Sequence, residues 1–190
     1  MKKVLFVTSE AVPFIKTGGL ADVAGSLPKY FDKEHYDVRV MLPKYLCIPE
    51  KWRSQMKYVT HFYMDLAWRS QYVGVLEMEY AGVHYYFIDN EFYFAGPKPY
   101  GYIHEDIEKF AFFSKAALSA MPLLGFKPDI VHCHDWQTGL VPVYMKERFH
   151  DGEFFRDMKS IMTIHNLKFQ GIWDLKTVSY THLTLPTILL

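Results

Sequence analysis

Three short polar segments of this chain carry residues whose types and spacing could do chemistry. They are Lys16-Thr17-Gly18-Gly19-Leu20, His134-Asp135 and His165-Asn166. The first lies between an apolar run and a stretch with helical spacing, so it predicts an anion site. Backbone N–H groups at a helix N-terminus have no partner within the helix, glycine lets a ligand approach the backbone, and lysine adds a positive charge. Phosphate is therefore the first ligand to consider.

The lysine-glycine segment is not one of the common nucleotide-binding motifs. It is neither G-x-G-x-x-G nor a Walker A sequence, so it supports neither a dinucleotide oxidoreductase nor a P-loop NTPase. The simpler alternative is a tight turn between a strand and a helix with a solvated lysine, because short motif matches often mislead.

The histidines and the aspartate also have simpler explanations. Asp135 could serve only as the cap of a following helix, and His134 and His165 could be structural histidines. His132 and His134 have a spacing that places both imidazoles on one face of a strand, as some metal sites require. No third ligand with a clear motif accompanies them, so we expect no metal.

Apolar periodicity predicts the elements that must position these segments. Strands are expected at residues 4–7, 36–42, 129–133 and 160–164, and helices at 20–31, 107–121 and 137–149. Pro142 should strain the last helix or shift its start. Strands that alternate with helices predict an α/β fold with a doubly wound, Rossmann-like parallel sheet.

Residues 56–89 have a different character. Three runs rich in Val, Tyr and Phe, with a turn at Ala81-Gly82, predict an antiparallel β insertion beside the parallel sheet. Residues 90–101 contain Gly, Pro and aromatics and should form a surface loop. Taken alone, Tyr100 in this loop is better explained as a packing residue than as a platform for a sugar.

Each of three polar segments follows the carboxyl end of an expected parallel strand: Thr8 to Lys16, His134-Asp135 and His165-Asn166. Open α/β sheets bind their ligands in the crevice along that edge. The segments should therefore converge on one site, and their convergence is a stronger argument than any single motif.

Composition restricts the class of protein. The chain has 190 residues, half of them apolar, which suffices for one domain with a sizeable core or for part of a larger protein. Its formal net charge of zero gives no reason to expect nucleic acid or an acidic membrane surface as a partner. With two cysteines and no apolar run long enough to cross a bilayer, we expect a soluble protein of the reducing cytoplasm.

Four segments, in order, resemble those of bacterial glycogen synthases and plant starch synthases: residues 3–10, 16–23, 134–140 and 163–171. The resemblance covers about residues 1–178. It implies two Rossmann-like domains that face a cleft, the GT-B arrangement, with this chain as part of the N-terminal, acceptor-side domain. The implied reaction transfers glucose from ADP-glucose to the non-reducing end of an α-1,4-glucan with retention, and it needs no cofactor.

The same resemblance gives the lysine-glycine segment a role. Departure of ADP develops negative charge on phosphate, which a lysine and helix N-terminal amides would stabilise. By resemblance Lys16 takes that role, with Gly18 and Gly19 beside the diphosphate.

The remaining roles concern the transferred sugar. By resemblance Asp135 and His165 contact the glucose, and Asn166 supports that arrangement. Tyr100 matches an aromatic residue at the rim of the family's sugar site. Lys16, Asp135 and His165 are thus the expected catalytic residues.

The end of the chain departs from the family pattern. Residues 179–190 contain no Asp, Glu, Lys or Arg and are expected to be a non-native tail. Members of the family are much longer, and their C-terminal domain supplies an arginine, a lysine and a glutamate to the donor site. We therefore expect the chain to be inactive by itself. The alternatives are another GT-B glycosyltransferase that uses a different nucleotide sugar, a stand-alone glucan-binding module and, least favoured, a metal-dependent hydrolase.

Overall fold

The structure, a computed structural model, describes residues 1–169 and 171, except for the side chains of residues 103 and 104. The end of the expected domain, residues 170 and 172–178, and the expected non-native tail, 179–190, lie outside the described residues. Within the described part, none of the helices has the length and apolar character needed to cross a membrane.

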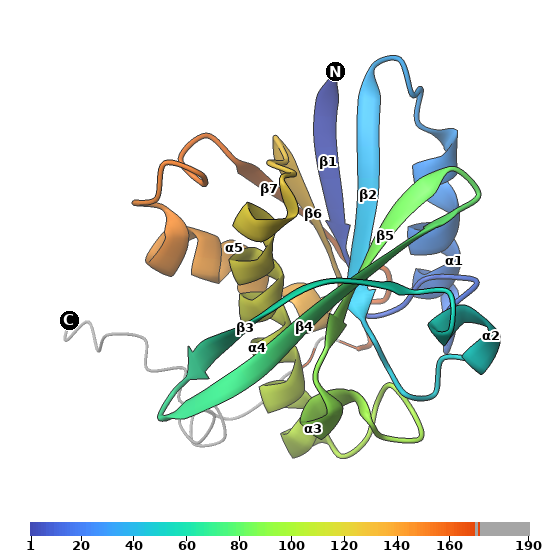
Figure 1. Cartoon of the computed structure of the whole chain (residues 1–190), viewed down its shortest axis with the longest axis vertical. Coiled ribbons are helices and arrows are strands. Elements are labelled where there is room, and N and C mark those ends of the chain that lie inside the picture. The colour runs from blue at the N-terminus through green and yellow to red at the C-terminus, as the bar shows by residue number, and fades with distance from the viewer. Residues whose placement is uncertain (170, 172–190) are drawn as a thin grey trace.

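Within the described residues, seven strands form one sheet in the order β3-β4-β5-β2-β1-β6-β7 (Figure 1). The strands are β1 (Lys2–Val7), β2 (Tyr36–Pro43), β3 (Lys57–Leu66), β4 (Arg69–Tyr80), β5 (Val83–Asp89), β6 (Ile130–His134) and β7 (Lys159–Thr163). Strands β5, β2, β1, β6 and β7 are parallel neighbours, whereas β3 and β4 form an antiparallel hairpin that pairs with β5. The chain winds first to one side of β1 and then to the other, which is the doubly wound order. The predicted fold class, including its antiparallel insertion, is confirmed.

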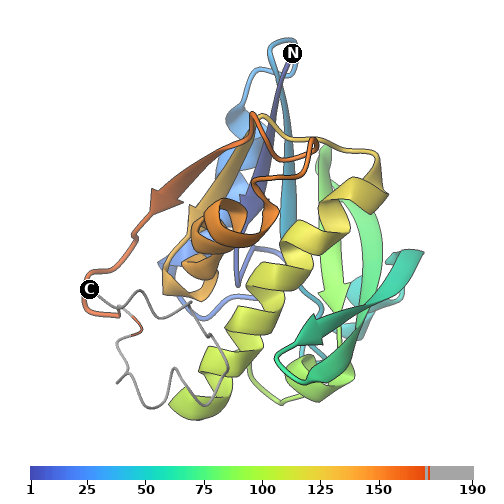
Figure 2. The ribbon, with the colours of Figure 1, turned by 90° about the vertical axis from the view of Figure 1, so that its left-hand side faces the viewer.

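Helices cover both faces of this sheet. One face carries α1 (Gly19–Ser26), and the opposite face carries α4 (Ile103–Ala120) and α5 (Leu140–Tyr144) (Figures 1 and 2). The short helices are α2 (Glu50–Arg53) and α3 (Glu91–Phe94). Turns of 3-10 helix lie at Leu27–Tyr30, Met121–Leu124 and Trp136–Thr138, and a π-helical turn follows α5 at Met145–Phe149.

The core lies on both sides of the central strands. Leu5, Phe6 and Val7 of β1 have no exposed surface, as expected for a parallel strand that helices cover on both faces. Strand β7, at the edge of the sheet, differs from this pattern. Its Ile161 and Met162 are 46% and 39% exposed although both are apolar, so β7 contributes little to the core.

Close packing fixes the loop between β1 and α1. A β-carbon at Gly25 of α1 would lie 2.2 Å from the carbonyl oxygen of Val12, so only glycine fits this contact. The Val12 N–H also donates to the carbonyl oxygen of Ala21, at 3.0 Å. The loop that follows β1 is therefore held against α1 before it reaches the polar segment.

Several predicted boundaries were wrong, each for a local reason. The helix predicted at 137–149 begins at Leu140, which is the shift of its start that we expected from Pro142. The proline thus lies in the first turn, where a backbone N–H has no intrahelical partner. The loop predicted at 90–101 contains α3, because Asn90 Oδ1 accepts the Tyr93 N–H at 3.1 Å and caps a helix that buries Phe94. His134, expected just beyond a strand, is the last residue of β6.

Candidate functional site

The candidate site lies where the winding of the sheet changes direction, between β1 and β6. Strand β1 pairs with β2 on one side and with β6 on the other, so the loops that leave β1 and β6 diverge. Such a divergence is the usual ligand-binding position in open α/β sheets. The loop after β1 leads to Lys16, and that after β6 begins with Asp135.

A buried carboxylate holds the loop that carries Lys16. Glu10 is only 2% exposed, and its carboxylate accepts hydrogen bonds from the Thr17 N–H, the Thr17 hydroxyl (2.7 Å) and the Tyr100 hydroxyl. Glu10 thus joins the lysine-glycine segment to the 90–101 region. We did not predict this role from the sequence, where Glu10 is only one acidic residue just beyond an apolar strand.

Lys16 and the two glycines lie at the N-terminus of α1, as predicted. The Lys16 ammonium pairs with Asp22 at 2.8 Å, and both side chains are about half exposed. Gly18 has an extended backbone (φ −153°), which any residue can adopt. A β-carbon at Gly18 or Gly19 would have no atom within 4 Å among the described residues, apart from the adjacent residues and the backbone of α1 itself. Packing therefore does not require these glycines, and their lack of side chains leaves the helix N-terminus open to an approaching group.

Asp135 has a strained backbone and a defined partner. Its φ of 57° and ψ of −179° fall in a region that almost only glycine occupies, at a cost of about 1–3 kcal/mol. Its carboxylate Oδ1 accepts the His165 N–H at 2.7 Å, while its own N–H donates to the Thr163 carbonyl oxygen at 2.9 Å. The side chain makes no capping bond to the helical turn that follows, so the helix-cap explanation is wrong.

A row of imidazoles connects β6 to the segment after β7. His134 Nδ1 lies 2.9 Å from His165 Nε2, and His132 Nε2 lies 2.7 Å from the Thr163 hydroxyl. The rings of His132 and His134 stack with centroids 4.3 Å apart, so alternation along β6 does place both on one face. Burial, with the neighbouring imidazoles of His132 and His165, lowers the pKa of His134 to about 3. His134 is therefore neutral at physiological pH.

His132 and His134 have the spacing of a metal site, but they are not part of a metal-binding cluster among the described residues. Across residues 1–169 and 171, no group of three or more His, Cys, Asp or Glu side chains is arranged to hold a metal ion. His132 and His134 instead hydrogen-bond to Thr163 and His165, respectively.

Tyr100 and Asn166 have local partners. The Tyr100 hydroxyl bonds to Glu10 and lies 2.8 Å from the Ser9 hydroxyl, and burial next to Glu10 raises its pKa well above the ordinary value. Asn166 is exposed, and its Oδ1 accepts the Lys168 N–H at 2.9 Å. The structure thus brings Asp135 directly onto His165 and links Tyr100 to the lysine loop through Glu10, whereas the Asn166 side chain bonds within its own turn.

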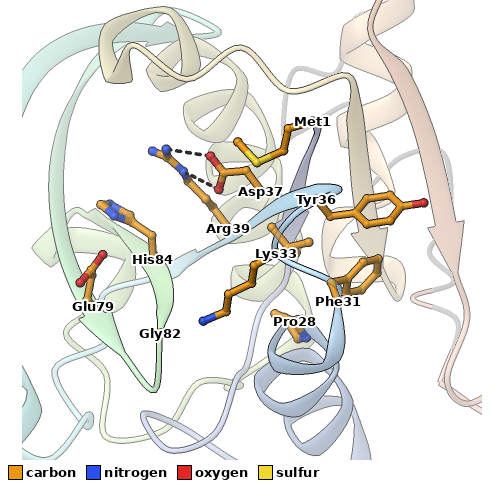
Figure 3. Close-up of a pocket in the computed structure, with 11 residues that line it drawn as sticks. Met1, Pro28, Phe31, Lys33, Tyr36, Asp37, Arg39, Glu79, Gly82 and His84 are labelled. Atoms are coloured by element: carbon orange, nitrogen blue, oxygen red, sulfur yellow. Dashed lines mark hydrogen bonds and ion pairs between the residues drawn. The ribbon is translucent and has the colours of Figure 1, made fainter.

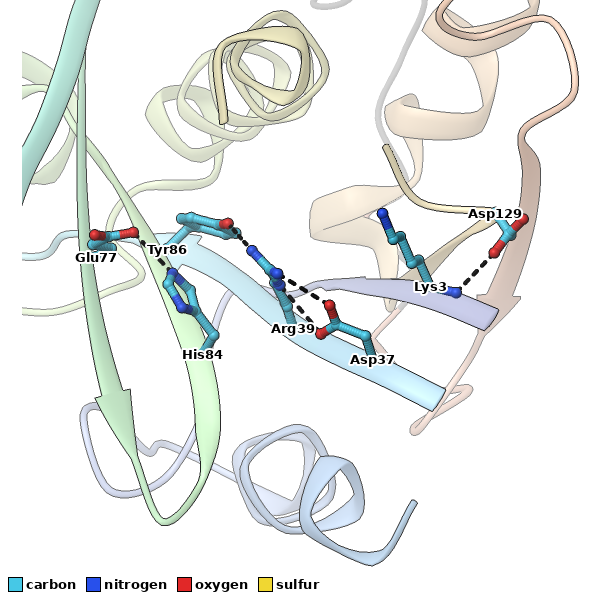
Figure 4. Close-up of polar contacts among 7 residues, drawn as sticks. All are labelled: Lys3, Asp37, Arg39, Glu77, His84, Tyr86 and Asp129. Atoms are coloured by element: carbon cyan, nitrogen blue, oxygen red, sulfur yellow. Dashed lines mark hydrogen bonds and ion pairs between the residues drawn. The ribbon is translucent and has the colours of Figure 1, made fainter. Parts of the chain in front are cut away.

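A second polar region lies at the opposite edge of the sheet, where β2 and β5 begin. A shallow cavity there is lined by residues that include Lys33, Arg39 and Glu79 (Figure 3). The Arg39 guanidinium lies 3.0 Å from the Asp37 carboxylate and donates to the Tyr86 hydroxyl at 2.6 Å (Figure 4). It also packs over the ring of Phe126. The Arg39 charge is thus already paired with Asp37, and we interpret this region as a structural hydrogen-bond network and not as a ligand site.

These observations define the class of protein first: a doubly wound α/β domain whose loops converge on an open helix N-terminus at the switch point. The chain belongs to the family of the starch synthase catalytic domain, whose model matches residues 3–188. This is a family of glycosyltransferases.

Individual relatives agree with this assignment. The chain is 76% identical over 178 residues to a glycogen synthase of Lachnospira eligens and 68% identical to one of Lachnoclostridium phytofermentans; each match covers 94% of this chain. The chain spans about 37% of the length of these relatives. The catalytic domain of starch synthase IV from Arabidopsis thaliana, bound to ADP and acarbose, is similar in fold (TM-score 0.77, 26% identity, 93% of this chain, 36% of that chain).

Proposed function

We propose that this chain forms the acceptor-side part of a glycogen synthase, within a GT-B enzyme that transfers glucose from ADP-glucose to the non-reducing end of an α-1,4-glucan with retention. The observation that carries the proposal is the open N-terminus of α1, with Lys16 beside it, at the same sheet edge as the Asp135–His165 contact. The glycogen synthase relatives and the starch synthase bound to ADP and acarbose support this choice of substrates.

In this proposal Lys16 stabilises the diphosphate as it departs. Breaking the glucose–phosphate bond leaves negative charge on ADP, and an ammonium with free helix N–H groups offsets that charge. Lys16 is paired with Asp22, but an exposed ion pair contributes only about 0–1 kcal/mol, so the ammonium can turn to a phosphate at little cost. The empty β-carbon positions at Gly18 and Gly19 leave room for the phosphate oxygens.

Asp135 and His165 then contact the transferred glucose, and the His165 backbone N–H holds the Asp135 carboxylate in place. Because one oxygen of the Asp135 carboxylate is held by the His165 N–H, the other can accept a hydrogen bond from a sugar hydroxyl. Asn166 shapes the turn after His165, and Tyr100 forms the rim of the site and holds the lysine loop through Glu10.

We propose that the domain covers residues 1–178, and that the donor-side groups lie in a part of the enzyme that corresponds to the remaining length of the relatives, of which this chain spans about 37%. We therefore propose that the chain alone does not transfer glucose. The two free cysteines, Cys47 and Cys133, suit a reducing compartment, the cytoplasm.

A chimera tests the proposal. The matched 178 residues of this chain would replace the corresponding segment of the L. eligens glycogen synthase, and transfer of labelled glucose from ADP-glucose to glycogen would be measured. We expect an active chimera, and about 10²–10³-fold loss of kcat with Lys16→Ala, the usual effect of removing one transition-state donor. Lys57→Ala, at the exposed start of β3, is the matched control. An inactive but folded chimera, or full activity with Lys16→Ala, would refute the proposal.

A further inference from the structure

His134 is a buried polar group with no direct part in the proposed reaction. It has no exposed surface, and its ring lies between the rings of His132 and His165, with centroids 4.3 Å and 5.2 Å away. Phe6 of β1 packs against the same ring at 4.8 Å. A side chain enclosed in this way cannot reach a substrate, so any effect on chemistry must pass through a neighbour.

The contact with His165 requires a definite distribution of protons. His134 Nδ1 and His165 Nε2 are 2.9 Å apart, and the rings are nearly parallel (15°). Between two neutral imidazoles such a contact holds one hydrogen, which belongs to either Nδ1 of His134 or Nε2 of His165. The proton position on one ring thereby determines the position on the other.

The opposite nitrogen of His134 decides between these two arrangements. His134 Nε2 is buried and has no hydrogen-bond partner among the described residues. If Nε2 carried the proton, an N–H donor would be buried without an acceptor, and orphaned buried N–H groups are rarer in proteins than under-satisfied acceptors. The proton of His134 therefore belongs on Nδ1, from which it is donated to His165 Nε2.

We propose that His134 is a positioning residue that holds His165 in the tautomer protonated at Nδ1. In this tautomer the Nε2 edge of His165 accepts from the protein interior, and the Nδ1 edge is a hydrogen-bond donor. This donor is suited to a hydroxyl or carbonyl oxygen, so His165 would act on the sugar as a donor. That last step alone rests on the proposed function.

Residue 135 completes the restraint. The Asp135 carboxylate accepts the His165 backbone N–H at 2.7 Å, while His134 hydrogen-bonds to the imidazole ring of His165. Two consecutive residues at the end of β6 thus fix both the backbone and the imidazole of His165. The Thr138 hydroxyl donates to the carbonyl oxygen of His134 at 3.0 Å and anchors this pair in turn.

The tautomer can be measured on the 190-residue chain without substrate. Long-range ¹H–¹⁵N correlation spectra of histidine-labelled protein distinguish a protonated from a bare ring nitrogen. We expect both His165 and His134 to carry the proton on Nδ1 and to have a bare Nε2. A His165 ring protonated at Nε2, or one that exchanges between both tautomers, would overturn the inference.

Three variants separate positioning from mere packing. His134→Phe keeps a ring but removes the donor, and His165 should then lose its single tautomer. His134→Asn retains an amide N–H near the place of Nδ1 and should restore the tautomer. His132→Phe, which removes the outer ring of the row, should leave His165 unchanged. If His134→Phe retains the native tautomer, or His134→Asn does not restore it in a folded chain, the inference is wrong.

The same variants in the chimera connect the tautomer to catalysis. We expect His134→Phe to lower kcat by about two- to tenfold, the effect of one ordinary hydrogen bond, and His134→Asn to recover most of the loss. An inactive parent chimera would count against the proposed function, whereas the spectra of the chain would still decide the tautomer. Equal kcat for His134→Phe and the parent would contradict a role of His134 in positioning His165 for catalysis.

Discussion

The strained backbone of Asp135 predicts an inverted order of stability for two simple variants. At an ordinary position an alanine variant is more stable than a glycine variant by about 0.4–1 kcal/mol, because glycine loses more backbone entropy on folding. At φ 57° and ψ −179° alanine retains the strain of about 1–3 kcal/mol, whereas glycine relieves it. Asp135→Gly should therefore be the more stable variant, by about 1 kcal/mol.

Asp135→Ala and Asp135→Gly lose the same hydrogen bond, so the difference in stability between them reports the backbone strain. Each removes the carboxylate that accepts the His165 N–H at 2.7 Å, and a bond to a charged group contributes about 1.5–3 kcal/mol. Asp135→Ala should thus be destabilised by about that amount, while Asp135→Gly should lie closer to the parent. Asp135→Asn keeps an acceptor and should lie between the parent and Asp135→Ala.

The free energy of unfolding of each variant is measured by urea denaturation of the 190-residue chain. The variants are compared at equal m-values, so that differences in midpoint report stability alone. Equal stability of the alanine and glycine variants, or greater stability of the alanine variant, would refute the strain argument. In the chimera both variants should lose transfer activity, since neither has the carboxylate, and this would separate strain from catalysis.

Three further outcomes follow from the site. Gly19→Ala should keep or raise the stability of the chain by up to about 1 kcal/mol in urea, since its β-carbon meets no described atom, yet lower kcat/KM of the chimera for ADP-glucose. Asp22→Ala should change the stability of the chain by less than about 1 kcal/mol, because the Lys16–Asp22 pair is exposed, and salt titration of unfolding checks this. Burial lowers the pKa of His134 from 6.5 to about 3. Between these two pH values only the unfolded state binds the proton, so the free energy of unfolding falls as pH drops from 6.5 toward 3 and does not depend on this group above pH 6.5. His134→Phe should flatten that part of the stability–pH curve, measured by urea unfolding at each pH.

The sequence predicts those strands and helices whose local spacing of apolar residues matches the faces that are buried in the fold. The run around Leu5 is apolar throughout because both faces of β1 are covered, and the helical spacing after Gly19 matches α1. Because parallel strands end at a common edge, the predicted sheet was enough to bring Asp135 and His165 to one place.

The remaining features depend on contacts distant in sequence. Glu10 is buried because Thr17 and Tyr100 provide its hydrogen bonds, and Tyr100 lies 90 residues away. The partner of Asp135 is the backbone of a residue 30 positions later, so a local motif indicates only a cap. Asn90 could have been identified as a helix cap from its residue type, but the adjacent aromatic and proline residues favoured a loop.

The exposed edge strand β7 gives the two sides of the site unequal resistance to opening. Lys16 follows β1, which is enclosed in the core, so the amide hydrogens of β1 should exchange only when the whole domain unfolds. His165 follows β7, which pairs only with β6 within the described residues and has exposed apolar side chains. Local fraying of β7 would carry His165 away from His134 and Asp135 while β1, which leads to Lys16, remains in place. Under the proposed function, the side of the site that contacts the sugar should therefore open more readily than the side that holds the phosphate.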